Sequence, residues 1–298
     1  MRPATDAAQR AYRLGGGLAM AGLLLTVAMV GAALSRLSVR GDPAHEASLA
    51  GVRVALPAAN PAAIALLILA TVGVGVLVAV LRGVWTIGRA HRRLQRGLPV
   101  AGELPEAPDV TVFAHDRVLA FCAGLLRPRV YVSSGALREL GDAELRAVLE
   151  HERLHRARRD PLRLVTARLL GEALFFAPAV RTLARRYDTF AELSADEHAL
   201  AAVGGDASVL ASAMLAFDAG VAPERADHAL GIAGDWTLPL GLSGMTAAGI
   251  AGLALLVWQL GHHAVLRTAL VSPAPCVIVL ALVPLSALAL GLWASRRF

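Results

Sequence analysis

His151-Glu152-Arg153-Leu154-His155 is the stretch that decides how this chain folds and what chemistry it can support. In a helix, residues i and i+4 lie on one face a turn apart, so the two imidazoles can converge on one metal ion. Glu152 follows the first histidine directly, where its carboxylate can take a proton from a water molecule. The pattern therefore predicts a helix that carries a catalytic metal site.

The flanking residues favour a helix over 142–159. Asp142 is the expected N-cap, and an apolar stripe follows at Leu145, Val148 and Leu149. Arginines gather at the other end, where cations complement the helix dipole. Both histidines then lie in the interior of a regular helix.

A catalytic zinc ion needs a third protein ligand and an open position for water. Glu192 is the expected ligand, because it lies in a helix predicted over 178–203 and closed by Gly204-Gly205. Asp196 follows on the same face, where it can orient a histidine through its free ring nitrogen. Asp160 precedes Pro161, which favours a helix cap, and a role beside the metal ligands stays open as well.

Taken together, these motifs resemble the integral-membrane gluzincins of the BlaR/MecR type and, through them, the related HtpX and CAAX prenyl protease group. The HExxH at 151–155, Arg158-Arg159-Asp160 and the ExxAD at 192–196 carry the resemblance, with the stretch 120–133 before them. It covers roughly residues 82–215. It implies one Zn²⁺ per chain, held by His151, His155 and Glu192, with Glu152 as the general base.

The composition is that of a membrane protein. Hydrophobic residues make up 56% of the 298 residues, and the mean hydropathy is +0.57. Four uncharged runs reach the length of about 20 residues that a membrane helix needs. We expect these spans at about 14–35, 60–82, 238–260 and 273–294.

The expected fold is thus an α-helical membrane protein with four transmembrane helices and an inserted peptidase domain. The N-terminal membrane region covers residues 1–82, the zinc metallopeptidase domain 83–237 and the C-terminal membrane region 238–298. The inserted domain is expected to be mainly α, of the α+β gluzincin type, because three short segments before the metal helix are rich in β-branched and aromatic residues. These segments, at 110–114, 118–123 and 129–133, predict a small antiparallel sheet.

The arginines predict the orientation. Ten of them flank the predicted spans on the side of the peptidase domain and four flank the other side, which favours a cytoplasmic domain in a bacterial plasma membrane. All 29 basic residues are arginine, so a Walker A lysine, a Schiff base and a Ser-x-x-Lys acylation site are excluded. We therefore expect a signal to enter through a separate sensor protein, the spans or the segment 37–60, and not through a β-lactam-binding domain. Direct nucleic-acid binding is not expected, because aromatic residues do not interleave the basic ones.

The expected reaction is hydrolysis of a peptide bond, in which Glu152 moves the proton from water to the leaving amine. A peptide substrate is expected to add as a strand to the edge of the sheet, near Val130, Tyr131 and Val132. The candidates for a further electrophile that stabilises the transition state are Tyr187, His198 and Arg225.

Three functions stay open. The BlaR resemblance implies cleavage of a cytoplasmic transcriptional repressor, a winged-helix protein of the BlaI/MecI type, in signal transduction. The HtpX resemblance implies quality control of membrane proteins. The third is a non-catalytic membrane scaffold that signals by conformation, which Glu152 disfavours because a structural zinc site needs no general base.

Overall fold

The computed structural model describes residues 3–36, 38–40, 45–49, 52–56, 58–217 and 237–267. The chain divides into two units, each built from segments that are distant in sequence. The first comprises Met1–Gly16, Trp85–Gly171 and Ala179–Leu240, and the second comprises Gly17–Val84, Glu172–Pro178 and Gly241–Phe298. The motifs at 151–160 and 192–196 both belong to the first unit.

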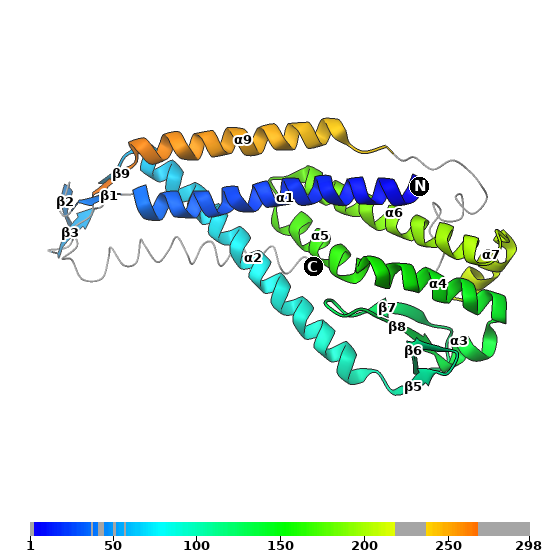
Figure 1. The fold of residues 1–298 in the computed structure, drawn as a ribbon. Helices are drawn as coiled ribbons and strands as arrows, with labels where there is room; N and C mark the ends of the chain where they lie inside the picture. The colour runs from blue at the N-terminus through cyan, green and yellow to red at the C-terminus, as the bar shows by residue number, and fades with distance from the viewer. Residues whose placement is uncertain are drawn as a thin grey trace. The chain divides into compact units, whose positions relative to one another are not determined.

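Three helices are long and apolar enough to cross a bilayer (Figure 1). They are α1 (Pro3–Arg36), α2 (Pro61–Gly97) and α9 (Leu240–His263). The predicted spans at 14–35, 60–82 and 238–260 fall on them, whereas the predicted span at 273–294 lies outside the described residues. With 34 and 37 residues, α1 and α2 are much longer than the span of about 20 residues, so each continues well beyond a bilayer's hydrocarbon core.

The start of α2 is fixed by Asn60, whose side-chain oxygen accepts a hydrogen bond from the backbone N–H of Ala63 at 2.9 Å. Pro61 then occupies the first helical position, where a missing N–H does no harm. The side-chain amide of Asn60 also donates to the carbonyl of His263 at 2.6 Å, which ties the start of α2 to the end of α9. Short strands of the second unit border these helix ends: β1 (Ser38–Arg40), β2 (His45–Leu49), β3 (Val52–Leu56), β4 (Ala58–Ala59) and β9 (Val265–Arg267).

The first unit contains a four-stranded sheet in the order β5-β6-β8-β7. Its strands are β5 (Val100–Leu104), β6 (Ala107–Phe113), β7 (Ala120–Ala123) and β8 (Arg129–Ser133). The prediction of an antiparallel sheet is wrong, because β6 and β8 run parallel and only the outer pairs are antiparallel. The reason is that β8 folds back from β7 into the place next to β6, so β7 becomes the outer strand.

A tight turn makes this return. Gly124 has φ +116°, a conformation that side-chain-bearing residues rarely adopt. A Cβ atom at this position would lie 2.6 Å from the carbonyl oxygen of Arg127. The turn between β7 and β8 therefore depends on glycine.

Five helices of the first unit follow the sheet: α3 (Ser134–Glu139), α4 (Asp142–Arg158), α5 (Asp160–Ala173), α6 (Pro178–Ala202) and α7 (Ala207–Ala216). The N-cap of α4 is Gly141 and not Asp142. Glu144 explains the shift. Its carboxylate, in the first turn of the helix, accepts a hydrogen bond from the backbone N–H of Gly141 at 2.9 Å and so satisfies the donor of the N-cap residue. Arg159, in the left-handed conformation with φ 58°, ends α4 and turns the chain into α5.

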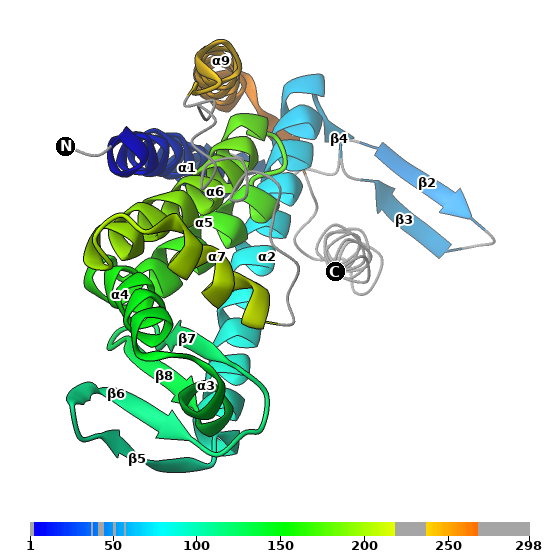
Figure 2. The same ribbon diagram turned by 90° about the vertical axis from the view of Figure 1, so that its right-hand side faces the viewer.

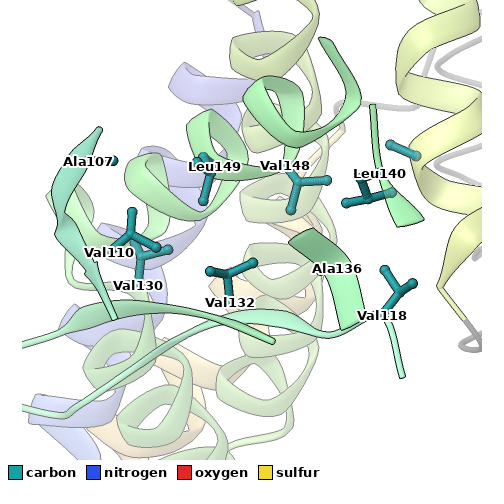
Figure 3. Packing of buried hydrophobic residues seen from close by; sticks show 10 residues of the cluster. Ala107, Val110, Val118, Val130, Val132, Ala136, Leu140, Val148 and Leu149 are labelled. Carbon is teal, nitrogen blue, oxygen red and sulfur yellow. The ribbon is translucent and has the colours of Figure 1, made fainter. Parts of the chain in front are cut away.

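The metal helix α4 rests on the sheet through an apolar core. Val110, Val130 and Val132 of the sheet point toward Val148 and Leu149 of α4 (Figure 3). This core is supplemented by ion pairs, in which Asp109 of β6 accepts hydrogen bonds from two nitrogens of Arg153 at 2.8 and 3.0 Å. The sheet thus fixes the position of α4, the helix that carries the two histidines described next.

Candidate metal-binding site

His151, His155 and Glu192 meet in the first unit, and one ligand atom from each lies within 4.8 Å of the others. The Nε2 atoms of the two histidines are 3.1 Å apart. Each also lies 3.6 Å from a carboxylate oxygen of Glu192. Helix α4 therefore presents its two imidazoles to a carboxylate from α6, as the spacing of the motifs predicts.

The other ring nitrogen of each histidine is held by a buried carboxylate. Nδ1 of His151 lies 3.0 Å from Oδ1 of Asp196, and Nδ1 of His155 lies 2.9 Å from Oδ2 of Asp160. A carboxylate only accepts, so each Nδ1 carries the proton and each Nε2 presents a lone pair to the centre of the cluster. Asp160 is the first residue of α5, and its carboxylate contacts His155 and Tyr187, which supports the role beside the candidate ligands that the sequence left open.

This arrangement favours a positive charge at the point where the two Nε2 atoms and the carboxylate of Glu192 meet. Burial lowers the pKa of His151, but hydrogen bonds with Asp196 and Glu192 and the negative charge of Glu152 outweigh it and raise the pKa to about 10. A positive charge at Nε2 of His151 is therefore favoured, and either a proton or a metal ion that takes the proton's place can supply it. Two imidazole lone pairs and a carboxylate around one point suit a divalent cation such as zinc, which takes N and O ligands in this combination. The donor set therefore fits the metal.

A cavity of about 390 Å³ opens beside the cluster. Glu152 lines it together with His151, His155 and Glu192. The general base expected from the sequence thus lines the same cavity as the three donor residues. Cys122 lines the same cavity, and burial, with the charges of Glu152 and Asp160, raises its pKa to about 12, so it remains a thiol at neutral pH.

The other walls of the cavity come from β7 and α7. Residues Ala120, Phe121 and Cys122 of β7 form one wall. Another part of the lining is apolar and consists of Leu210, Ala213, Met214 and Phe217. Helix α7 was missed from the sequence, although its N-cap is readable: the Asp206 side chain accepts the backbone N–H of Ser208, just before an apolar run.

The expected substrate strand near Val130, Tyr131 and Val132 requires correction. These residues lie in β8, whose two sides are already paired with β6 and β7, and Val130 and Val132 are fully buried. An inner strand has no free N–H or C=O groups for another chain. The outer strand is β7, which stands at the end of the sheet next to β8 (Figures 1 and 2) and borders the cavity.

The three candidate electrophiles are not confirmed either. Tyr187 is 2% exposed, and its hydroxyl donates to Oδ1 of Asp160 at 2.6 Å. This hydrogen bond directs the hydroxyl to Asp160 and not to a substrate. His198 faces Glu150 at 3.3 Å. Of the described residues, neither is among those that line the cavity, and Arg225 lies outside the described residues.

Comparison with known proteins agrees with this geometry. The model of the BlaR1 peptidase M56 family matches residues 44–227, more than half of the chain and inclusive of every donor in the cluster. No curated protein and no solved structure gave a match. By its sequence match, its apolar helices and its His-His-Glu cluster, the chain belongs to the BlaR1 peptidase M56 family of membrane metallopeptidases.

Proposed function

We propose that the protein is a zinc-dependent endopeptidase of the bacterial plasma membrane, with His151, His155 and Glu192 as the ligands of one zinc ion per chain. The observation that carries this proposal is the orientation of the two imidazoles. Both Nδ1 atoms are held by buried carboxylates, at 3.0 and 2.9 Å, while both Nε2 atoms face Glu192. Such buried partners fix both tautomers and raise the basicity of the ligands.

Bound zinc supplies a Lewis acid that polarises a peptide carbonyl and makes water more acidic. Glu152 borders the same cavity and accepts the proton of the attacking water, then delivers it to the amine that leaves. Asp160 and Asp196 keep the imidazoles in place during these steps. The C–O bond to the water oxygen forms first, and the C–N bond breaks once the amine has received the proton from Glu152, so water is the only further reactant.

The substrate enters as an extended segment along β7. The ladder register pairs Ala120 with Val132 and Cys122 with Val130, and the carbonyl of Leu119 accepts the N–H of Ser133. Bonded and non-bonded pairs alternate in an antiparallel ladder, so the N–H and C=O groups of Ala120 and Cys122 point to the free edge. A peptide that pairs there lies across the cavity, with its side chains toward the apolar wall of α7.

We infer that the biological substrate is a cytoplasmic repressor of the winged-helix BlaI/MecI type, cut in response to a signal from a separate sensor protein. Membership of the BlaR1 peptidase family supports this role. The excess of arginines on the side of the peptidase domain supports a cytoplasmic site. In this scheme the protein contacts the lipid bilayer and a protein substrate, but not DNA itself.

The test of catalysis is Glu152→Gln. The variant should bind zinc like the wild type, because Glu152 is not a ligand, but cleavage should fall by about 10²- to 10⁴-fold with the loss of the general base. Metal analysis and peptide cleavage on detergent-purified protein measure both properties. Glu150→Gln is the matched control: Glu150 pairs with Arg153 and His198, so this variant should cleave like the wild type. Unchanged cleavage by Glu152→Gln would reject Glu152 as the general base, whereas a wild type that cleaves nothing would favour the non-catalytic scaffold.

The test of the biological role is coexpression with a winged-helix repressor encoded next to the gene. One defined fragment, absent with Glu152→Gln, is the expected product. Degradation to many small fragments, or of misfolded membrane proteins in general, would instead favour quality control of the HtpX kind.

A further inference from the structure

We propose that Tyr187 is a positioning residue for the metal ligand His155, that it acts through Asp160, and that Tyr12 of α1 holds it in place. The inference rests on the proposed function, because it concerns the groups behind the same candidate zinc site. It assigns to the N-terminal segment of α1, residues 3–16, a part in setting how firmly the metal is held.

The first link is a pair of hydrogen bonds on one carboxylate. Asp160 uses Oδ2 for Nδ1 of His155 at 2.9 Å and Oδ1 for the hydroxyl of Tyr187 at 2.6 Å. Its side chain is 1% exposed, so these contacts, and not water, set its orientation. A carboxylate held at both oxygens cannot swing about its last torsion, and the ring of His155 is fixed with it.

The chemistry of Tyr187 suits a permanent donor. Burial, and then its contact with Asp160, raise its pKa above the ordinary value of a phenol. The hydroxyl therefore keeps its proton at neutral pH and can donate to Asp160. Because the donor is neutral, it adds no positive charge that competes with His155 for the carboxylate of Asp160.

The second link is the contact between Tyr187 and α1. The ring of Tyr12 packs 5.1 Å from that of Tyr187, between centroids, at 45°. The guanidinium of Arg163 lies 5.2 Å from the centroid of the Tyr12 ring. Around this pair, small buried residues of α1, Ala4, Ala7, Ala8 and Ala11, let the helix approach α6 closely.

A second contact fastens the same face of α1. Thr5, seven residues before Tyr12, has its hydroxyl 2.8 Å from that of Ser194 on α6. Ser194 in turn accepts a hydrogen bond from Arg158 at the end of α4, also at 2.8 Å. Residues 3–16 of α1 are thus joined at two points to helices α4 and α6, which carry the candidate ligands.

A tyrosine that merely fills space would be replaceable by phenylalanine, and this distinction defines the test. Zinc affinity is measured by chelator competition on full-length protein in detergent. Tyr187→Phe keeps the ring and removes the donor, and it should weaken zinc binding by about tenfold, the lower end of the range for partners behind metal ligands. Tyr12→Ala should act in the same direction, whereas Tyr12→Phe keeps the ring contact and should match the wild type.

One further measurement separates positioning from simple stability. In the Co²⁺-substituted protein, Tyr187→Phe should shift the visible absorption bands, which report ligand geometry. Tyr12→Phe should leave them unchanged. A wild-type spectrum and wild-type zinc affinity in Tyr187→Phe would overturn the inference. Wild-type zinc affinity in Tyr12→Ala would overturn the part of it that links α1 to the site. If the wild-type protein binds zinc and cleaves while Tyr187→Phe is unaffected, only this inference fails. A wild type that binds no zinc ends both proposals.

Discussion

At the scale of single residues, the candidate site is an arrangement of negative charge around two imidazoles. Asp196 reaches His151 from α6 and Asp160 reaches His155 from α5, and both carboxylates are buried. Burial of two carboxylates is unfavourable unless hydrogen bonds or cations compensate it. A zinc ion bound as proposed would supply that compensation, so the carboxylates and the metal would stabilise each other.

Asp196→Asn tests this mutual dependence. An amide can still accept the Nδ1 proton of His151, but the negative charge that strengthens the imidazole is lost. Zinc affinity should fall by about 10- to 100-fold, as measured by chelator competition. Asp188→Asn changes the same charge on the same helix at an exposed ion pair with Arg168, and should bind zinc like the wild type. Equal zinc affinity in the two variants would show that the charge of Asp196 does not strengthen His151 as a zinc ligand.

Much at this scale was readable from the sequence. The positions of His151, His155 and Glu192 follow from helical spacing, and the structure brings them together. The contact made by Tyr187 could not be predicted from the sequence, because a tyrosine in a helix can face the cavity or the core. Its hydroxyl binds Asp160, and only the packing of α5 against α6 decides this.

At the scale of elements, helices were predicted better than the sheet. The observed α4 and α6 end within one residue of the predicted ranges, since proline, glycine and charged residues mark helix ends locally. The glycine turn also marks the β7–β8 hairpin locally. Nothing local specifies that β8 lies parallel to β6, since strand order depends on contacts between distant segments.

The outer strand β7 leads to a prediction about substrates. If a peptide pairs with β7, its amides should be engaged at every second residue, opposite Ala120 and Cys122. N-methylation of one such amide removes a hydrogen bond worth about 0.5–1.5 kcal/mol, so kcat/KM should fall by roughly two- to tenfold. Methylation of the amides between them should have little effect. A series of peptides methylated at single positions measures this, and a profile without alternation would exclude strand addition at β7.

At the scale of the whole chain, composition gives the class of protein but not the extent of its helices. Hydropathy locates apolar runs, and three of them coincide with α1, α2 and α9. It does not reveal that α1 continues to Pro3, because Ala4, Ala7, Ala8 and Ala11 are weakly apolar and their burial depends on Tyr187 and Phe190. The short pairing of β1 and β4 with β9 was equally hidden, since it joins segments more than 200 residues apart.

The division into two units predicts where metal removal acts. Zinc bound only by the folded protein adds stability of RT ln(1 + [Zn]/Kd), about 4 kcal/mol at 1,000 times Kd. Its donors lie on α4 and α6 of the first unit, whereas α9 from Gly241 onward belongs to the second. Chelation should therefore accelerate amide hydrogen exchange in peptides from 142–158 and 178–202, measured by mass spectrometry in detergent, and leave 241–263 unchanged. His155→Ala, which lacks a ligand, should exchange fast with or without chelator. Uniform acceleration across all helices would mean that the metal stabilises the chain as one cooperative unit, because local protection changes only where opening is coupled to the lost ligand.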